Sequence, residues 1–515
     1  KDANNIPWGG AGAGNGNYTS GETYTINKLF AITGYAGTGG TILSYVDGTS
    51  KTVTTGPDGT YAITVSKYWT GTVTPAHPCY TFTPSNRTYP ALTANQTGQN
   101  YTATFNPASG CANVNVNIGG NSLGNYGVPV GSEARLYFNA SGGPVKVESI
   151  NDKNIVSAIR LQSFDLATNT LYSFVETMGV PQGLLSHKYY FPTYNNTWAP
   201  LNSQVRFGNL DAAQTRIRVT IGGVNVWEED VPGQEERRLY FDVSGGPVVI
   251  ESLDPAKKIV AAIRLQSFDI PSNTLYSFSE TMGIPDQVLS HEYYFPTYNN
   301  TWAPLNSQVR FGNLDAAQTR IRVTIGGVNV WEQDVPGLEE RRLYFDVSGG
   351  PVVIESLDPA KKIVAAIRLQ SYASNTLYSF SETMGIPDQV LSHEYYFPTY
   401  NNTWAPLNSQ VRFGNLDAAQ TRIRVTIGGV NVWEEDVPGL EERRLNFNVS
   451  GGPVKVESLD PTKKIVAAIR LQSFDIPSNT LYSFSETMGI PDQVLSHEYY
   501  FPTYNNTWAP LNSQV

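Results

Sequence analysis

The chain has 515 residues, a formal net charge of −10 and only 16% charged residues. An acidic chain of this kind lacks the basic surface that nucleic-acid binding requires. No apolar run approaches the roughly 20 residues of a membrane-spanning helix. Glycine (46), proline (32) and tyrosine (30) are abundant, which favours strands and turns over helices. We therefore predict an all-β protein without a nucleic-acid partner and without a transmembrane segment.

The first segment, residues 1–22, is rich in glycine and asparagine, with Gly9–Gly14 at its centre. Such a composition cannot bury a core, so we predict a flexible leader or an arm that orders on contact with a partner. No signal peptide is visible in this segment, and we expect a mature or trimmed form of the protein.

In the next segment, residues 23–105, turn sequences alternate with short strand-like runs. The turns are Gly39-Gly40, Asp47-Gly48 and Pro57–Gly59, and Thr60–Val65 (TYAITV) alternates in polarity between its neighbours. This pattern predicts a small β-sandwich.

The same segment resembles the carboxypeptidase-regulatory-like and collagen-adhesin B-type domains of secreted proteins. The residues that carry the resemblance are Gly34–Gly37, Gly40–Tyr45, Asp47-Gly48, Gly56–Val65, Trp69–Pro75 and Tyr80–Pro84. The resemblance implies a transthyretin-like sandwich that serves as a spacer or stalk and has no catalytic role.

The rest of the chain repeats itself. The segment Val205–Gln308 recurs at Val309–Gln410 and at Val411–Gln514, and a degenerate copy precedes it. Each copy has one histidine, and spacings of 104, 102 and 104 residues separate His187, His291, His393 and His497. An array of near-identical modules supplies length or valency, whereas an active site needs one set of residues in one place. We therefore predict that the protein is not an enzyme and has no catalytic residues.

Each repeat is predicted to be an Ig-like β-sandwich, because about seven short strands alternate with turn signals. The predicted repeats are residues 106–204, 205–308, 309–410 and 411–515. In the second repeat, strands are expected near residues 203–208, 215–221, 224–231, 238–243, 247–251, 259–268 and 274–282, then a turn at 285–289 and a strand at 292–295. A two-residue turn at Gly222-Gly223 predicts that Arg218 lies opposite Trp227 and that Arg216 lies opposite Glu229.

The joints between repeats contain no linker, since LNSQVRFGNL runs across each boundary. We therefore expect semi-rigid joints and a rod of sandwiches. The chain stops at Val515, the first residue of a further VRFG strand, and an incomplete strand is an aggregation hazard in a monomer. We expect strand addition from a neighbouring chain to complete this end, with the leader as the candidate donor. The alternative is a native chain that continues past Val515.

Cys79 and Cys111 are the two cysteines of the chain. In a chain of secreted character they favour a disulfide across the junction between the N-terminal module and the first repeat, in preference to two unrelated buried thiols. In the chain-entropy model, closing a loop of about 30 residues stabilises the fold by about 3 kcal/mol.

Ten Asn-x-Ser/Thr sequons are candidate glycosylation sites. They are Asn17, Asn86, Asn95, Asn100, Asn139, Asn195, Asn299, Asn401, Asn448 and Asn505. Four of them recur at one place in the repeats, the YNNTW loop, where a glycan requires an exposed loop.

The strongest candidate contact segment is the repeated block HEYYFPTYNNTWAP. In the second repeat its side chains are His291, Tyr293, Tyr294, Phe295, Tyr298 and Trp302. Tyrosine and tryptophan are enriched in protein interfaces, and their flat rings together with asparagine amides also suit sugar rings and hydroxyls. We expect the block to form the joint between repeats, with a subunit contact and glycan binding as the alternatives.

No His-x-x-x-His, His-Glu-x-x-His or Cys-x-x-Cys spacing occurs, so we predict no metal site and no cofactor. Each histidine is expected to be packed at a domain end. Calcium at the loop residues Asp254, Asp269 and Asp286 is a weaker alternative.

The repeats also resemble tandem modules of large secreted bacterial proteins, in which LNSQVRFGN, VTIGG, GGPVKV, SETMGIP and EYYFPTYNN recur in series. This resemblance spans Ala112–Val515 and implies an extracellular or cell-surface location. We predict a structural glycoprotein that assembles with itself into a filament, sheath or S-layer-like polymer. The alternative is a multivalent adhesin or carbohydrate-binding protein that uses the YYFPTYNNTW blocks for adhesion.

Overall fold

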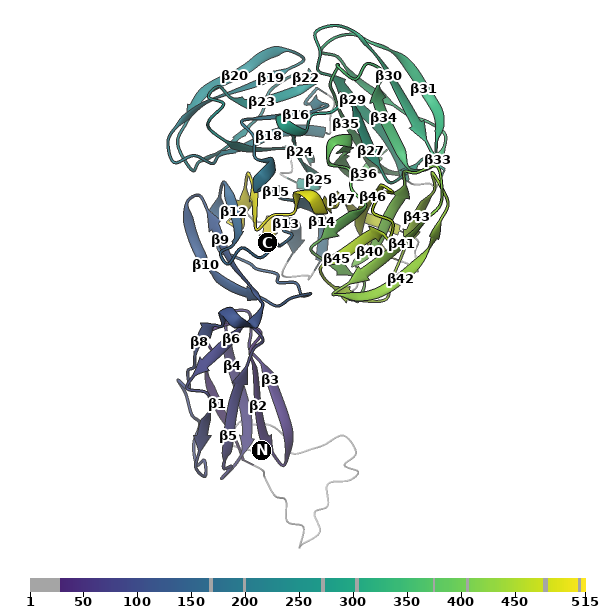
Figure 1. Ribbon diagram of the computed structural model, residues 1–515. Helices are drawn as coiled ribbons and strands as arrows, with labels where there is room; N and C mark the ends of the chain where they lie inside the picture. Colours follow the sequence, from purple (N-terminus) through teal and green to yellow (C-terminus); the bar gives the residue numbers. More distant parts are fainter. Residues whose placement is uncertain are drawn as a thin grey trace, which may run out of the picture. The chain divides into compact units, whose positions relative to one another are not determined.

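The computed structural model describes residues 28–165, 170–197, 201–269, 274–301, 305–373, 376–403, 407–475, 480–507 and 511–515. Within these ranges the chain forms β-strands and five short 3-10 turns, and no α-helix, so the all-β prediction is confirmed. The described residues include no helix that is long and apolar enough to cross a membrane. The chain divides into two compact units, Lys1–Asn106 and Pro107–Val515 (Figure 1).

The N-terminal unit is a small β-sandwich, as predicted. Its strands are β1 Leu29–Tyr35, β2 Ile42–Asp47, β3 Thr49–Thr54, β4 Thr60–Ser66, β5 Gly71–Ala76, β6 Tyr80–Thr83, β7 Arg87–Tyr89 and β8 Thr102–Phe105. The four-stranded sheet has the order β3-β2-β5-β7, and β1-β4 and β6-β8 form two-stranded sheets. Trp69 lies in the core between Tyr45 and Tyr89, and its indole N–H donates to the Val46 carbonyl at 2.6 Å. This bond satisfies the polar atom that the buried ring carries.

The second unit, Pro107–Val515, contains four similar sets of strands, which we call ring units one to four. Ring unit two consists of β16 Lys188–Phe191, β17 Tyr194–Asn195, β18 Leu201–Asn209, β19 Thr215–Ile221, β20 Val224–Val231, β21 Glu236–Leu239, β22 Ser244–Gly245, β23 Val248–Ser252, β24 Ile259–Asp269, β25 Thr274–Met282 and β26 Ile284–Pro285. One sheet has the order β20-β19-β23-β16-β26 and the other has the order β21-β18-β24-β25, with β17-β22 as a short pair.

Ring units three and four have the same strand order. Unit three consists of β27 Glu292–Phe295, β28 Tyr298–Asn299, β29 Leu305–Asn313, β30 Thr319–Ile325, β31 Val328–Val335, β32 Glu340–Leu343, β33 Ser348–Gly349, β34 Val352–Ser356, β35 Ile363–Ala373, β36 Thr376–Met384 and β37 Ile386–Pro387. Unit four consists of β38 Glu394–Phe397, β39 Tyr400–Asn401, β40 Leu407–Asn415, β41 Thr421–Ile427, β42 Val430–Val437, β43 Glu442–Leu445, β44 Ser450–Gly451, β45 Val454–Ser458, β46 Ile465–Asp475, β47 Thr480–Met488 and β48 Ile490–Pro491.

Ring unit one is assembled from both ends of this part of the chain. It consists of β9 Ala112–Ile118, β10 Asn121–Val128, β11 Ser141–Gly142, β12 Val145–Ser149, β13 Ala158–Asp165, β14 Thr170–Met178 and β15 Val180–Pro181, together with β49 Glu498–Phe501, β50 Tyr504–Asn505 and β51 Leu511–Gln514. The 3-10 turns are η1 Pro107–Ser109, η2 Gln182–Leu184, η3 Asp286–Val288, η4 Asp388–Val390 and η5 Asp492–Val494.

The strands predicted for the second repeat are largely present, and the strands β19, β20, β25 and β27 have the predicted bounds. Ile217, Val219 and Ile221 face the core. The strand expected at residues 238–243 lies earlier, at β21, because the Phe241 N–H donates to the Tyr194 hydroxyl at 2.9 Å and leaves the ladder.

The predicted register of the β19-β20 hairpin is wrong by one residue. Arg218 lies opposite Glu228 and Arg216 lies opposite Asp230, because a bulge separates Val219 from Thr220. Gly222 and Gly223 do form the turn, with φ values of 56° and 78°, a conformation that glycine adopts at little cost.

The structural units are offset from the sequence repeats, because each five-stranded sheet takes its fourth strand from the preceding repeat. In ring unit two, β16 pairs with β23 and β26. In the first repeat no preceding copy exists, and β49 from the end of the chain pairs with β12 and β15 instead. In Figure 1 the yellow end of the chain accordingly lies among the blue strands. The four units therefore close into a ring.

This closure corrects the expectation of a rod with an open end. The final strand β51 is not exposed for a neighbouring chain, since it pairs with β13 of the same chain over Leu511–Gln514. The continuity of LNSQVRFGNL across every joint, which we took as the sign of a stiff rod, is the sign of strands shared between adjacent ring units.

The centre of the ring is formed by the strands β14, β25, β36 and β47, each of which lies against the next one (Figure 1). One phenylalanine from each of these strands packs on leucines of the preceding ring unit: Phe278 on Leu161 and Leu511, Phe380 on Leu201 and Leu265, Phe484 on Leu305 and Leu369, and Phe174 on Leu407 and Leu471. Threonine hydroxyls follow the same cycle: Thr177 donates to the Glu280 carbonyl, Thr281 to Glu382, Thr383 to Glu486 and Thr487 to Glu176, at 2.9–3.1 Å.

We predict that Phe174→Ala lowers the free energy of unfolding of the ring as much as Phe278→Ala does, by about 3–5 kcal/mol in each case. The reason is that the contact between units four and one is equivalent to the contact between units two and one. Chemical denaturation followed by circular dichroism measures both effects. Val224→Ala, at a site that is 64% exposed, is the neutral control. A Phe174→Ala variant as stable as this control contradicts closure.

Candidate functional site

One strand position in the ring is only half filled. In ring unit two, β18 pairs with β21 on one side through Val205–Gly208, and with β24 on the other side along its whole length. In ring unit one the equivalent strand β51 ends at Gln514, and Val515 exchanges backbone hydrogen bonds of 2.8 and 3.0 Å with Leu136. Val515 corresponds to Val205, and the given sequence ends with it.

The two sheet edges that flank this position are left without a partner strand between them. On one side, residues 133–135 correspond to the start of β21 but form no strand. On the other side, β13 begins at Ala158, whereas β24 begins at Ile259, whose counterpart is Ile155. Val156 is half-buried, while its counterparts Val260, Val364 and Val466 are fully buried.

A cavity of about 530 Å³ occupies the space between these edges, and we call it the strand slot. Its lining is mostly apolar and includes Val114, Val128, Leu136, Val147, Val156 and Pro453. Val515, at the end of the given sequence, also lines it.

The filled positions in the other ring units show which side chains such a slot accepts. Phe207 is fully buried, and its ring centroid lies 5.5 Å from that of Trp227. A Cβ atom on the following Gly208 would approach Pro144 to 2.7 Å, so the close packing there requires glycine. Gly312 meets Pro247 and Gly414 meets Pro351 in the same way. The counterpart of these prolines in the strand slot is Pro453.

The charged residues beside the slot also differ from those in the other units. In unit two, Arg264 and Arg206 lie 2.7 and 3.6 Å from the buried carboxylate of Glu280. Burial alone raises the pKa of Glu280, but the two guanidinium groups bring it below its usual range. In unit one, Glu176 has Arg160 at 2.8 Å. Arg135 donates to the Thr399 hydroxyl at 3.2 Å, as Arg206 does to Thr503 at 3.0 Å.

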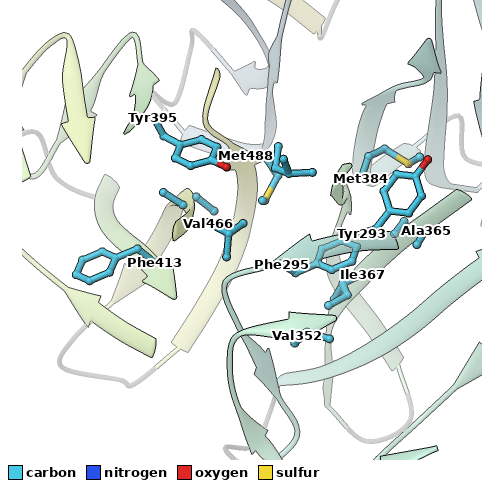
Figure 2. Close-up of a cluster of buried hydrophobic side chains, with 14 of the residues drawn as sticks. Tyr293, Phe295, Val352, Ala365, Ile367, Met384, Tyr395, Phe413, Val466 and Met488 are labelled. Atoms are coloured by element: carbon cyan, nitrogen blue, oxygen red, sulfur yellow. The ribbon is translucent and has the colours of Figure 1, made fainter. Parts of the chain in front are cut away.

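The aromatic block of the repeats, by contrast, lies in the core. Tyr293, Phe295 and Tyr298 are at most 2% exposed, and Figure 2 shows Tyr293 and Phe295 among the aliphatic side chains of ring unit three. Tyr294 and His291 are half-buried, and Trp302 falls outside the described residues. The block supplies the strand that completes the next ring unit, which agrees with the joint that we expected. Because the rings of Tyr293, Phe295 and Tyr298 are buried, they cannot stack on a sugar, and the alternative of glycan binding is wrong for these three residues.

Four of the candidate glycosylation sites are buried. Asn195, Asn299, Asn401 and Asn505 are between 2% and 4% exposed. The Asn299 side chain accepts a hydrogen bond from Ser348 at 3.0 Å, and the amide of Asn300 donates to the carbonyls of Ser307 and Phe345. A glycan on these asparagines is incompatible with the packing, so these four predictions are wrong. Asn86, Asn95, Asn100, Asn139 and Asn448 are exposed, and Asn17 lies outside the described residues.

Both cysteines, Cys79 and Cys111, are disulfide-bonded, and neither is free. Two of the calcium candidates have separate roles, because Asp254 accepts the Ala256 N–H at 3.0 Å in a turn and Asp286 accepts the Tyr190 hydroxyl at 2.9 Å. The Asp269 side chain lies outside the described part of the chain.

His291 has neighbours that the sequence spacing did not reveal. Single ligand atoms of His291, Glu292 and Asp388 lie within 4.8 Å of one another. The prediction that no histidine has metal-type neighbours is wrong for this residue, because Asp388 comes from the following repeat.

The same joint recurs in every ring unit, with one difference in charge. The cross-strand pairs are Glu498 and Glu148, Lys188 and Glu251, Glu292 and Glu355, and Glu394 and Glu457. Three of these pairs contain or contact a lysine. Lys146 lies 2.8 Å from Glu148 and 3.1 Å from Glu498, and Lys455 lies 2.8 Å from Glu457 and 3.6 Å from Glu394. Lys188 is itself a member of its pair and lies 3.1 Å from Glu251. Unit three has Val353 where unit four has Lys455.

The charge difference affects the glutamates directly. Burial raises the pKa of Glu292, and the neighbouring carboxylates Glu355 and Asp388 raise it further. Burial also acts on Glu498, but hydrogen bonds from Tyr500 and Lys146 bring its pKa below the usual range. Ionised Glu292 therefore opposes folding, whereas ionised Glu498 favours it.

No protein-family model matches the chain, and no curated protein matches it in sequence. Among solved structures it is similar to an anti-sigma factor domain-containing protein, with 8% identity, a TM-score of 0.12 and coverage of 67% of this chain and 99% of that one. The major pilin subunit BcpA of Bacillus cereus shows 9% identity, a TM-score of 0.13 and coverage of 70% and 96%. Dimeric latent PorU of Porphyromonas gingivalis shows 10% identity and a TM-score of 0.11, and the match covers 76% of this chain and 35% of that one. At these TM-scores none of the three is a template for the ring.

We predict that Val353→Lys raises the free energy of unfolding by up to about 1 kcal/mol at pH 7, because it adds a positive charge beside Glu292, whereas Glu355 already has Arg322 at 2.8 Å. The pKa of Glu292 is higher in the folded than in the unfolded protein. The loss of stability caused by its ionisation is therefore absent at pH values below the unfolded pKa, and it grows as the pH rises through the folded pKa. The gain should therefore shrink at pH 4, as measured by chemical denaturation.

Lys455→Val is the matched control for this prediction, since it creates the valine arrangement in unit four and should destabilise the protein at pH 7. An effect of Val353→Lys that is the same at both pH values would show that the Glu292 charge is not its cause.

Proposed function

We propose that the protein is an extracellular structural subunit that joins other copies of itself in a surface filament, sheath or S-layer-like polymer. The four similar, strand-sharing units carry this proposal, because repeated modules supply contacts and rigidity and not one catalytic constellation.

The ring gives such a polymer a rigid building block. Adjacent units share strands, central phenylalanines and threonine hydrogen bonds, so a force on one unit is distributed over the whole ring. The subunits of the proposed polymer are therefore closed rings, and not stiff rods. The small N-terminal sandwich is then the spacer.

The disulfide supports an extracellular location, because disulfides persist in oxidising compartments. The buried charges support a structural role and not an enzymatic one. Arg264 and Glu280, 2.7 Å apart, recur as Arg368 with Glu382 and as Arg470 with Glu486 at the same distance. In such a buried pair each charge is satisfied by its partner inside the ring. The adhesin alternative loses its main support with the burial of the aromatic block.

The test is the behaviour of the purified full chain over a range of concentrations. We expect polymers in negative-stain microscopy, and a mass in size-exclusion chromatography with light scattering that increases with concentration. A wild-type chain that is monomeric at every concentration rules the proposed function out.

A further inference from the structure

We infer that ring unit three binds a divalent transition-metal ion, with Zn²⁺ as the best fit, between the side chains of His291, Glu292 and Asp388. This inference does not depend on self-assembly. It rests on the grouping of the three side chains and on the way in which the equivalent joints of the other ring units differ from it.

The three side chains meet where the shared strand joins the unit that receives it. His291 directly precedes β27, Glu292 is the first residue of β27, and Asp388 is the first residue of the turn η4 in the following repeat. One ligand atom of each lies within 4.8 Å of the other two, and all three residues are half-buried. Zn²⁺ accepts imidazole nitrogen and carboxylate oxygen at about 2.0–2.2 Å, so small rotations of these side chains bring them onto one ion.

The hydrogen bonds around the group orient its carboxylates without neutralising them. The Ser290 hydroxyl donates to the Asp388 carboxylate, and the Tyr294 hydroxyl donates to that of Glu292. Both donors are neutral, and the residue opposite Glu292 is a further glutamate, Glu355. A bound cation supplies the positive charge that buried carboxylates require, while the neutral donors keep the ligands in position.

Ring units one and two each lack one of the three ligands. Unit one has Gln182 where unit three has Asp388, and its Glu498 has Lys146 at 3.1 Å. Unit two has Lys188 where unit three has Glu292. A lysine at or beside a ligand position repels a metal cation, so neither joint offers a site.

Ring unit four has all three ligand types and differs by one neighbour. His393, Glu394 and Asp492 are the equivalent residues, but Lys455 lies 3.6 Å from Glu394, at the position where unit three has Val353. Among the residues that the structure describes, the grouping within 4.8 Å occurs in unit three alone. The chain is therefore expected to bind one ion, which fastens β27 to the turn of the unit that receives it.

The first experiment titrates Zn²⁺ into the full chain, freed of metal beforehand with EDTA, and follows it by calorimetry. We expect one ion per wild-type chain and none for His291→Ala. This substitution keeps the backbone bond in which the His291 carbonyl accepts the Ser356 N–H at 2.8 Å. His187→Ala in unit two is the matched control, since the His187 carbonyl accepts the Ser252 N–H at 2.7 Å, and it should bind Zn²⁺ as the wild type does.

The second experiment exchanges the neighbour and leaves every ligand in place. Val353→Lys should weaken Zn²⁺ binding by about 10- to 100-fold, the range for changes beside metal ligands. Lys455→Val should raise the number of bound ions from one to two, because it frees Glu394. Zn²⁺ should also raise the denaturation midpoint of the wild type and of Lys455→Val, and leave that of Val353→Lys nearly unchanged at the same concentration.

No binding by the wild type would overturn the inference. Equal binding by the wild type, His291→Ala and Val353→Lys would also overturn it, since the ion would then lie elsewhere. A Lys455→Val chain that still binds one ion would contradict the role given to the lysine. Circular dichroism of each metal-free variant shows that a loss of binding is not a loss of fold.

Discussion

The ring depends on one constraint: no repeat can complete its own five-stranded sheet. The missing strand is EYYF of the preceding repeat, with Tyr293 and Phe295 at most 2% exposed in ring unit three. Each such side chain contributes roughly 1.5–3 kcal/mol by burial, so an uncompleted sheet at one end and an unburied strand at the other would be costly. In this chain the two defects compensate each other, because the last EYYF strand lies on the first sheet.

Closure also explains why the centre of the ring is so regular. The strands β14, β25, β36 and β47 can only form a cycle if the first and last units meet, and the phenylalanine and threonine contacts continue across that joint without a change of pattern. The exception lies further out. There a cavity of about 530 Å³ adjoins the last strand, β51.

Much of the fold could be predicted from the sequence, because its signals are local. The alternation of apolar and polar residues predicted β19 and β20, and Gly222-Gly223 predicted the turn between them. The bulge after Val219 shifts the register of this hairpin by one residue from the predicted one. The origin of the fourth strand could not be predicted, since LNSQVRFGNL fits both a rod and a shared strand. Whether an array of repeats is open or closed depends on the angle between adjacent units. This angle is set by packing between units, such as that of Phe278 on Leu161, and the sequence of one repeat does not reveal it.

The candidate site was harder to predict. The last strand was expected to be exposed at the end of a rod, but it pairs with β13 within the closed ring. The aromatic block attracted attention through its composition, yet Tyr298 and Asn299 are buried, because the same residue types serve in cores and in binding faces. The grouping at His291 was missed because its members come from two repeats, and only an internal comparison shows that Val353 stands where a neighbouring unit has lysine.

Ring closure is the central claim, and a cysteine cross-link between the two ends tests it most directly. Gln162 and Asn512 lie opposite each other in ring unit one, as Gln266 and Asn202 do in ring unit two. A Gln162→Cys, Asn512→Cys chain should oxidise to a disulfide within one molecule as readily as a Gln266→Cys, Asn202→Cys chain, as read by non-reducing electrophoresis and peptide mapping. Cross-links only between chains, or none with the first pair while the second pair forms, would contradict the ring.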